Sequence, residues 1–171
     1  MSESWEIKGE AKVRAALDAL DAAYEVLPCD PELADTQAFC AHYGIPLEDS
    51  ANAIIVASKK EPRQYSACLV LATTRLDVNH AVRRLMSVKR LSFASAEQTM
   101  ELTGMMVGGV TPFGLPEDLP LYIDRRVMGR PSVVIGGGSR SCKIRLAPAV
   151  LEKLPQAHVV DALALPVEQR G

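Results

Sequence analysis

Aromatic residues are scarce in this sequence, and neither its cysteines nor its histidines have the spacing of a metal-ligand set. Aromatic side chains make up 5% of the 171 residues, which argues against an extended platform for stacking nucleobases. There is no CxxC pair, and the histidines show no ligand spacing among themselves or with the cysteines. We therefore expect reduced thiols, no metal and no cofactor. The residues concerned are Cys29, Cys40, Cys68, Cys142, His42, His80 and His158.

The sequence also lacks a long apolar run and an excess of charge of either sign. No stretch approaches the roughly 18 apolar residues of a membrane-spanning helix. Residues 1–10 are charged, without the apolar region of a signal peptide. We predict a cytoplasmic protein with no membrane partner. The formal net charge is −2, so a nucleic acid would have to bind to a local basic patch.

Length and composition predict one globular domain. Of the 171 residues, 48% are hydrophobic and 23% charged, which suffices for a core without metal or disulfide crosslinks. No repeat or linker interrupts the chain, so we assign 1–171 to one domain, with its core at about 12–162 and a frayed tail at 166–171. Strand and helix patterns do not alternate strictly, which favours the mixed α/β class, a mixed sheet with peripheral helices.

Two apolar stretches, 53–56 and 66–71, have the strongest strand pattern, and their continuous apolar character predicts central strands covered on both faces. The charged, proline-containing segment 59–63 predicts a hairpin turn between them. One helix is expected to begin with a Ser95/Gln98 capping box and to end at Gly104. The further strands expected are 24–27, 90–94, 121–124, 132–135, 143–146 and 158–160, and the further helices are 8–22, 35–44, 78–87 (capped by Asp77) and 148–154.

Two glycine-rich segments, 104–114 and 136–140, each follow an apolar run. Neither has the spacing of a Walker A loop or of a dinucleotide-binding loop. Glycine at such points either forms a tight turn between strands or lets the backbone come close to a ligand. The glycines leave both turns without bulky side chains. The second segment also contains or adjoins three polar residues, Ser139, Arg140 and Lys143. This combination favours a ligand site.

The familiar catalytic sets are missing. There is no G-x-S-x-G nucleophile motif, and His42 and His80 fall in predicted helices as exposed residues. Asp124 ends an apolar strand, where a carboxylate that caps the following turn is the simplest interpretation. We interpret the cysteines as small buried apolar residues, with Cys29 at a strand end as the candidate for reactivity and substrate contact.

Basic residues gather in two parts of the chain, and such clusters can bind phosphates. They are Arg83, Arg84, Lys89 and Arg90 in the first part, and Arg125, Arg126, Arg130, Arg140, Lys143 and Arg145 in the second. A solvated helix face is the usual explanation for Arg83 and Arg84. The candidates for nucleic-acid contact are Arg83, Arg84, Arg140 and Lys143.

Residues 102–114, Leu-Thr-Gly-Met-Met-Val-Gly-Gly-Val-Thr-Pro-Phe-Gly, resemble the signature of the YbaK/prolyl-tRNA synthetase-associated domain family, TG-x-x-x-GG-[IV]-[ST]-P-x-G. The order of the surrounding segments is similar too, with VLAT at 70–73, VKR-x-x-FA at 88–94, VVIGGG-x-R at 133–140 and KIRLAP at 143–148. The resemblance extends over about 16–160, and the signature is more specific than an isolated glycine motif.

The resemblance implies a mixed, barrel-like sheet and a role in translation fidelity. Domains of this family, free-standing or inserted in a synthetase, hydrolyse the ester between a wrong amino acid and tRNA without a metal. Backbone groups and the terminal ribose hydroxyl assist the attack of water. The implied partners are the acceptor end of a mischarged tRNA and an aminoacyl-tRNA synthetase. By position, the implied catalytic residues are Asn52, Gly108 and Gly109, and the implied substrate-binding residues are Thr111, Pro112, Gly114, Gly137, Gly138 and Ser139.

One position departs from the family pattern. A lysine usually precedes the first central strand, where its charge would hold the terminal phosphate or ribose and stabilise developing negative charge. Counted from Gly44, this sequence has Asn52 at that position. Asparagine donates hydrogen bonds without a charge, and charge-assisted bonds are roughly twice as strong. Loss of such a contact would cost on the order of 10²–10³ in rate, and Lys59 and Lys60 in the next turn are not expected to reach the pocket.

Three functions remain open: an editing deacylase that works without this lysine, a non-catalytic paralogue that binds aminoacyl-tRNA or a synthetase, and a small hydrolase or binding domain unconnected with tRNA. The basic clusters fit the third less well. Apolar residues near the glycine-rich segment predict a pocket for a small or medium side chain. They are Met105, Met106, Val107 and Phe113. Family precedent favours alanine, serine or cysteine as the amino acid that is removed from the tRNA.

Overall fold

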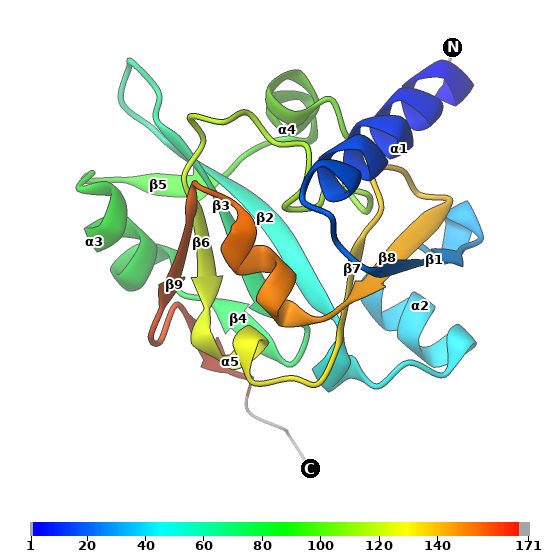
Figure 1. Cartoon of the computed structure of the whole chain (residues 1–171). Helices are drawn as coiled ribbons and strands as arrows, with labels where there is room; N and C mark the ends of the chain where they lie inside the picture. Colours follow the sequence, from blue (N-terminus) through cyan, green and yellow to red (C-terminus); the bar gives the residue numbers. More distant parts are fainter. Residues whose placement is uncertain (1, 168–171) are drawn as a thin grey trace.

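The fold is built on a five-stranded mixed sheet (Figure 1). The computed structural model describes residues 2–167. Strand β3 lies at the centre, antiparallel to β2 and parallel to β6, while β5 and β9 form the edges. The bounds are β2 Ala51–Ser58, β3 Tyr65–Leu71, β5 Leu91–Phe93, β6 Leu121–Asp124 and β9 Ala157–Val160. The order β5-β2-β3-β6-β9 confirms the predicted mixed sheet.

A second, antiparallel sheet has the order β1-β8-β7, and β4 pairs separately with β10. The bounds are β1 Tyr24–Pro28, β4 Thr74–Leu76, β7 Val133–Gly136, β8 Cys142–Leu146 and β10 Ala164–Pro166. A single parallel bridge between Ser50 and Val134 connects the start of β2 with β7. Over residues 2–167 the strands form three separate sheets, so the mixed α/β class is confirmed, whereas the barrel suggested by the resemblance does not close.

Helices lie around these sheets (Figure 1). They are α1 Ser2–Ala19, α2 Thr36–Tyr43, α3 Arg83–Met86, α4 Ala96–Thr103 and α5 Arg125–Met128, with 3₁₀ segments at Pro31–Leu33, Leu47–Asp49 and Pro148–Lys153. The predicted capping box of α4 is present, and Gly104 ends that helix at φ 73°. Within the described residues, no helix combines the length and apolar character needed to cross a bilayer.

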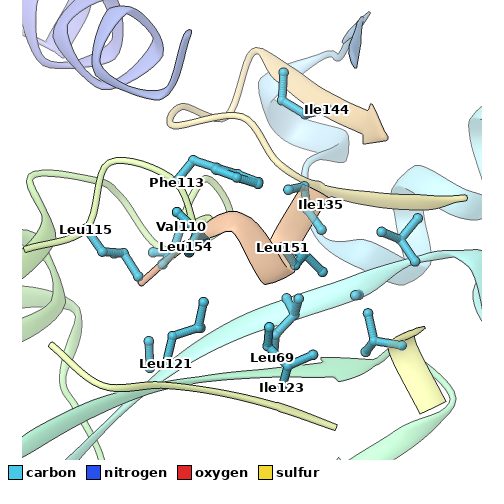
Figure 2. Packing of buried hydrophobic residues seen from close by; sticks show 14 of the residues in the cluster. Leu69, Val110, Phe113, Leu115, Leu121, Ile123, Ile135, Ile144, Leu151 and Leu154 are labelled. Carbon is cyan, nitrogen blue, oxygen red and sulfur yellow. The ribbon is translucent and has the colours of Figure 1, made fainter. Parts of the chain in front are cut away.

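Apolar side chains cover both faces of the five-stranded sheet, as the continuous apolar pattern of β2 and β3 predicts. In Figure 2 the side chains of Leu69 and Ile123 point from the sheet toward Leu151, in the larger core. Alternation along β3 places Val70 on the opposite face, where it belongs to a second cluster with Val82. Full burial of one such side chain stabilises the fold by roughly 1.5–3 kcal/mol.

Three helix predictions are wrong in detail. The helix predicted over 8–22 begins at Ser2 and ends at Ala19, because the chain turns at Asp21 with a left-handed φ of 56°. Asp77 makes no side-chain capping bond, and a π-helical turn, Val78–Val82, precedes a short α3. Its carboxylate instead contacts Nδ1 of His80 at 3.1 Å. The predicted helix at 148–154 is a 3₁₀ segment.

The end of the chain also differs from the prediction. The short strands β4 and β10 were not expected, because three-residue strands carry too little alternation to be distinguished from loops. Pro166, predicted as the start of a frayed tail, ends β10 opposite Thr74. Residues 168–171 of that tail lie outside the described residues.

Candidate functional site

A pocket of about 250 Å³ opens beside β2, between the two larger sheets. Strand β5 pairs with β2 only at 56–58, and β7 meets this part of the chain only at Ser50. The edge of β2 between them has no neighbouring strand within the described chain, and the pocket occupies this gap. Its lining comes from four parts of the chain: 34–36, 50–54, 107–110, and the β7–β8 pair with 134–136 and Lys143.

Asn52, half-buried on β2, lies in the wall of this pocket. Its Oδ1 accepts a hydrogen bond from the hydroxyl of Thr36 at the start of α2. This contact orients the amide and leaves Nδ2 as the donor that Asn52 can offer a ligand. The backbone of β2 contributes as well. Ile55 O accepts a hydrogen bond from Ala94 N at 2.9 Å, which shows that the backbone groups of Ile55 face the β5 side of the strand. Alternation along the strand therefore directs the backbone N–H and C=O of Ala53 into the gap.

Lys143 brings a buried ammonium group to the same pocket. The residue is 7% exposed, and its Nζ donates to the carbonyl oxygens of Ala34 at 2.7 Å and Gly108 at 3.1 Å. The ring of Phe39 lies beneath it, with its centroid 5.6 Å from Nζ. Burial lowers the pKa of Lys143 below its usual value, and the charge of Arg140 adds to this effect. An ammonium has three N–H donors, so one remains beyond the two carbonyl contacts.

Arg140, in the second glycine-rich segment, connects the first glycine-rich segment, 104–114, to the segment before α2. Its guanidinium donates to the carbonyl oxygens of Pro31 at 3.0 Å and Val107 at 3.1 Å, and Nη1 lies 3.5 Å from Oδ1 of Asp35. Lys143 connects the same two segments one layer deeper, through Ala34 and Gly108. These two cations therefore hold the pocket's walls together. Both remain candidates for nucleic-acid contact; Lys143 lines the pocket, whereas Arg140 contacts its lining residues Val107 and Asp35.

The two glycine-rich segments pack directly on each other through their backbones. Gly138 N donates to Gly109 O at 2.8 Å. A Cβ on Gly136 would lie 2.2 Å from Val110 O, and one on Gly109 would lie 2.7 Å from the Ser139 backbone. Of the glycines predicted at the site, Gly108 lines the pocket, whereas Gly109, Gly137 and Gly138 are not among its lining residues. Gly108 therefore fits the interpretation of a glycine close to a ligand. Gly109 fits the interpretation of a tight packing position, because a side chain there would meet the Ser139 backbone.

The remaining residues predicted in the two glycine-rich segments are not among those that line the pocket. Thr111 and Pro112 are buried, and among the described side chains Oγ1 of Thr111 is the one fully buried polar atom without a hydrogen-bond partner. Gly114 has a φ of 80° and faces Lys12 of α1. Ser139 is fully buried, donating to Oε1 of Glu10 at 2.7 Å. These contacts attach α1 to the two segments.

Cysteine chemistry has little support at this site. All four cysteines are free and buried. Burial raises the pKa of the Cys29 thiol, whose Sγ donates to Asp30 O at 3.2 Å. A protonated thiol is a weak nucleophile, and Cys29 is not among the residues that line the pocket. Among the side chains that the structure describes, residues 7–167, no three His, Cys, Asp or Glu form a group that could hold a metal ion.

The apolar lining differs from the prediction. Met105 and Phe113 are buried in the main core rather than in the pocket (Figure 2 labels Phe113), and Val107 is the predicted apolar residue that lines it. Val107 also borders a second, more apolar depression of about 310 Å³. Phe93, which is 59% exposed, forms another part of its rim. The two depressions share Ala53, Ile54, Val107, Gly108 and Val110.

The sequence did not identify Asp35 and Thr36 as site residues, although both were predicted correctly at the start of a helix. The only available signal was that helix start, because the contact between Thr36 and Asn52 depends on how α2 packs on β2. Arg83 and Arg84 are exposed on α3, away from the lining of this pocket.

Comparison with known protein families identifies the fold around this pocket. A family model described as the aminoacyl-tRNA editing domain matches residues 30–154. The chain belongs to this family. The matched range contains every segment that lines the pocket, so the Asn52–Lys143 pocket lies within the editing domain.

Individual relatives agree with this assignment. Among solved structures, a candidate trans-editing enzyme for prolyl-tRNA synthetase superposes with a TM-score of 0.78 at 26% identity, covering 94% of this chain and 98% of that one. The proline–tRNA ligase of Paraburkholderia phymatum is 27% identical over 107 residues, 62% of this chain and 18% of the ligase. A candidate Cys-tRNA(Pro)/Cys-tRNA(Cys) deacylase of Enterococcus faecalis, EbsC, is 24% identical over 85 residues, 44% of this chain and 52% of EbsC. These matches therefore span about half, or less, of the curated relatives.

Proposed function

We propose that this editing domain is an aminoacyl-tRNA deacylase, which hydrolyses the ester bond of a mischarged tRNA. The observation that carries the proposal is the presence, in one pocket of about 250 Å³, of the Lys143 ammonium and the Asn52 amide. Ester hydrolysis concentrates negative charge on the carbonyl oxygen in its transition state, and a fixed cation with hydrogen-bond donors stabilises that charge.

The substrate bond is the ester between the amino acid and the terminal ribose of the tRNA. A water oxygen attacks the carbonyl carbon, and the ester C–O bond to the ribose then breaks. One proton of the attacking water passes to the ribose oxygen, the other is released to solvent, and the amino acid leaves as its carboxylate. The neighbouring ribose hydroxyl of the substrate orients the attacking water. Lys143 stabilises the oxyanion, and Nδ2 of Asn52 with the backbone of Ala53 orients the aminoacyl group.

Lys143 supplies the charge that Asn52 lacks. The family pattern has a lysine where this chain has Asn52, on β2, while Lys143 comes from β8 in the other sheet. The ammonium is already desolvated, and its two carbonyl contacts fix its position before substrate binds. Electrostatic stabilisation is strongest from a group that needs no reorganisation during the reaction. This preorganisation favours retained catalysis over loss of activity.

The pocket also limits the substrate. A volume of about 250 Å³ is at the small end for a ligand site, and part of it must hold the ribose. We therefore propose a small amino acid, such as alanine, serine or cysteine. The acceptor end of a tRNA is the partner, and an aminoacyl-tRNA synthetase that produces the mischarged tRNA is a second.

The test is the release of amino acid from a panel of mischarged tRNAs, in single-turnover reactions corrected for spontaneous hydrolysis. We expect turnover by the native chain, a loss on the order of 10²–10³ for Lys143→Met, and a smaller loss for Asn52→Ala. Lys153→Met is the matched control, because Lys153 is exposed and, within the described residues, donates only to Leu20 O. Native activity that survives Lys143→Met unchanged would remove Lys143 from the mechanism.

The alternative is a non-catalytic domain that binds aminoacyl-tRNA. The uncharged Asn52 at the family lysine position favours it. In that case the native chain binds mischarged tRNA without turnover, and Asn52→Lys restores hydrolysis. If neither chain hydrolyses or binds any member of the panel, the assignment to tRNA fails.

A further inference from the structure

A second, larger groove lies at the far end of β2 from the pocket. It has a volume of about 650 Å³ and runs between the β2–β3 turn and the segment that leads from α3 to β5. In Figure 1 this turn projects on the same side of the molecule as α3 and β5. The lining residues are Ser58, Lys59, Lys60, Glu61, Pro62, Gln64, Ser87, Val88, Lys89 and Arg90.

The groove is basic, and its cations are available. Lys59, Lys60, Lys89 and Arg90 are all exposed. Over the described residues, none of them is within salt-bridge distance of a carboxylate. The one acidic residue of the lining, Glu61, is engaged by Arg63 at 3.0 Å. The groove therefore presents four unneutralised positive charges in a protein whose formal net charge is −2.

Hydrogen bonds hold the two walls of the groove in place. Lys59 N donates to Arg90 O at 3.1 Å, which joins the turn to the segment before β5. Within the turn, the hydroxyl of Ser58 accepts from Gln64 N at 2.8 Å and donates to Lys60 O at 3.3 Å. The cations thus project from a braced backbone, which reduces the entropy lost when a ligand binds.

The groove and the pocket lie along one strand. Residues 50–54 line the pocket, 53–55 line the apolar depression with Phe93, and Ser58 opens the groove. With a rise of roughly 3.3 Å per residue, the chain from Asn52 to Lys59 spans about 23 Å. A tRNA joins its aminoacyl ester to its duplex stem through an unpaired CCA end, so stem phosphates must lie at some distance from the ester.

We infer that this groove binds the phosphates of the tRNA acceptor stem while the aminoacyl end lies in the Asn52–Lys143 pocket. The inference rests on the proposed function and names where the body of its substrate docks. Lysine binds phosphate as a point charge, independently of sequence. The exposed aromatic ring of Phe93, between groove and pocket, offers a surface for stacking a base of the unpaired end.

The test compares two triple variants of equal charge change. The groove variant is Lys59→Glu/Lys60→Glu/Lys89→Glu, and the control is Lys8→Glu/Arg75→Glu/Lys153→Glu, made at exposed positions outside the groove. We measure tRNA affinity against salt concentration, and the hydrolysis of mischarged tRNA and of the corresponding aminoacyl-adenosine. Circular dichroism of both variants verifies folding.

We expect the groove variant to bind tRNA at least about tenfold more weakly than the control at low salt, with a salt dependence less steep by two to three charges. Its kcat/KM for mischarged tRNA falls by a similar factor, while hydrolysis of aminoacyl-adenosine is unchanged. Equal affinities and salt slopes in the two variants would overturn the groove inference. Absence of hydrolysis with both substrates in the native chain would overturn the deacylase proposal, while the affinity measurement still decides the groove.

Discussion

The guanidinium of Arg140 occupies the space that a side chain on Gly108 would need. A Cβ at residue 108 would lie 2.3 Å from Nη1 of Arg140, and Gly108 has a φ of 96°. This same Nη1 donates to Val107 O. Position 108 therefore requires glycine for two reasons: its backbone is left-handed, and Arg140 leaves no room for a side chain.

Gly108→Ala should destabilise the fold by about 1–3 kcal/mol and reduce deacylation more than its effect on stability explains, because Arg140 must leave Val107 O. Gly129→Ala is the control: its Cβ would meet only Arg126 O, at 3.6 Å, without a left-handed φ. Urea unfolding and single-turnover hydrolysis measure the two effects. Equal behaviour of the two variants would contradict the role assigned to Gly108.

The buried ammonium of Lys143 predicts a pH dependence. Because burial lowers its pKa, the group loses its proton at a lower pH than an exposed lysine does. The rate of deacylation, corrected for spontaneous hydrolysis, should therefore fall as the pH rises through this lowered pKa. Lys143→Arg keeps its charge to above about pH 12, so the alkaline fall should move to higher pH. Identical alkaline limbs in both proteins would show that another group titrates.

The effect of Lys143 on stability has the opposite sign. Between the lowered pKa of the folded state and the ordinary pKa of the unfolded state, the unfolded chain binds more protons. The free energy of unfolding contributed by this residue therefore rises with pH across that window. The difference in unfolding free energy between the native chain and Lys143→Met, followed by urea denaturation at several alkaline pH values, should show this rise.

The unpartnered hydroxyl of Thr111 predicts a stabilising substitution. Thr111→Val removes a buried polar atom that has no hydrogen bond and should raise the free energy of unfolding by about 1 kcal/mol. Thr103→Val is a matched control, because the Thr103 hydroxyl donates to Thr99 O at 2.7 Å and accepts from Met105 N at 3.0 Å. That variant should be destabilised. A fall in kcat/KM for Thr111→Val alongside increased stability would support the substrate contact implied by the family signature.

Asp124 predicts a structural effect without a catalytic one. The residue is 1% exposed, and its carboxylate accepts from Ala164 N at 2.7 Å and Arg126 N at 2.8 Å. Asp124→Ala should cost about 2–4 kcal/mol, because the buried Ala164 N and the partly buried Arg126 N both lose their hydrogen-bond acceptor. Asp161→Ala, which removes an exposed partner of Arg125, should cost less than about 1 kcal/mol. Thermal unfolding distinguishes them, and equal shifts in Tm would refute this role.

Local patterns were sufficient to predict most strands and the helix ends at Gly44 and Gly104. The capping role of Asp124 was also predicted from its position, and the structure confirms it. These features depend on neighbours a few residues apart. The π-helical turn after Asp77 was not predictable in this way, because the capping pattern there is the same as that of a regular helix.

Lys143 was expected beside a ligand site and as a candidate for nucleic-acid contact, but its burial was not predicted. Along β8, the residues Cys142, Ile144 and Leu146 alternate with Lys143 and Arg145, which predicts a polar outer face for the second pair. Arg145 follows this prediction, but α2 and the segment before it cover Lys143. Only the packing of one element on another turns this lysine from a surface charge into a pocket residue.

The pairing of β1 with β8 joins residues 24–28 to 142–146, and it has a consequence for protein synthesis. Because the two strands are far apart in the sequence, contacts between them form slowly. A nascent chain that has not yet released β8 from the ribosome lacks both the partner of β1 and the ammonium of Lys143. The Asn52–Lys143 pocket would thus be complete only after β8 has left the ribosome and paired with β1.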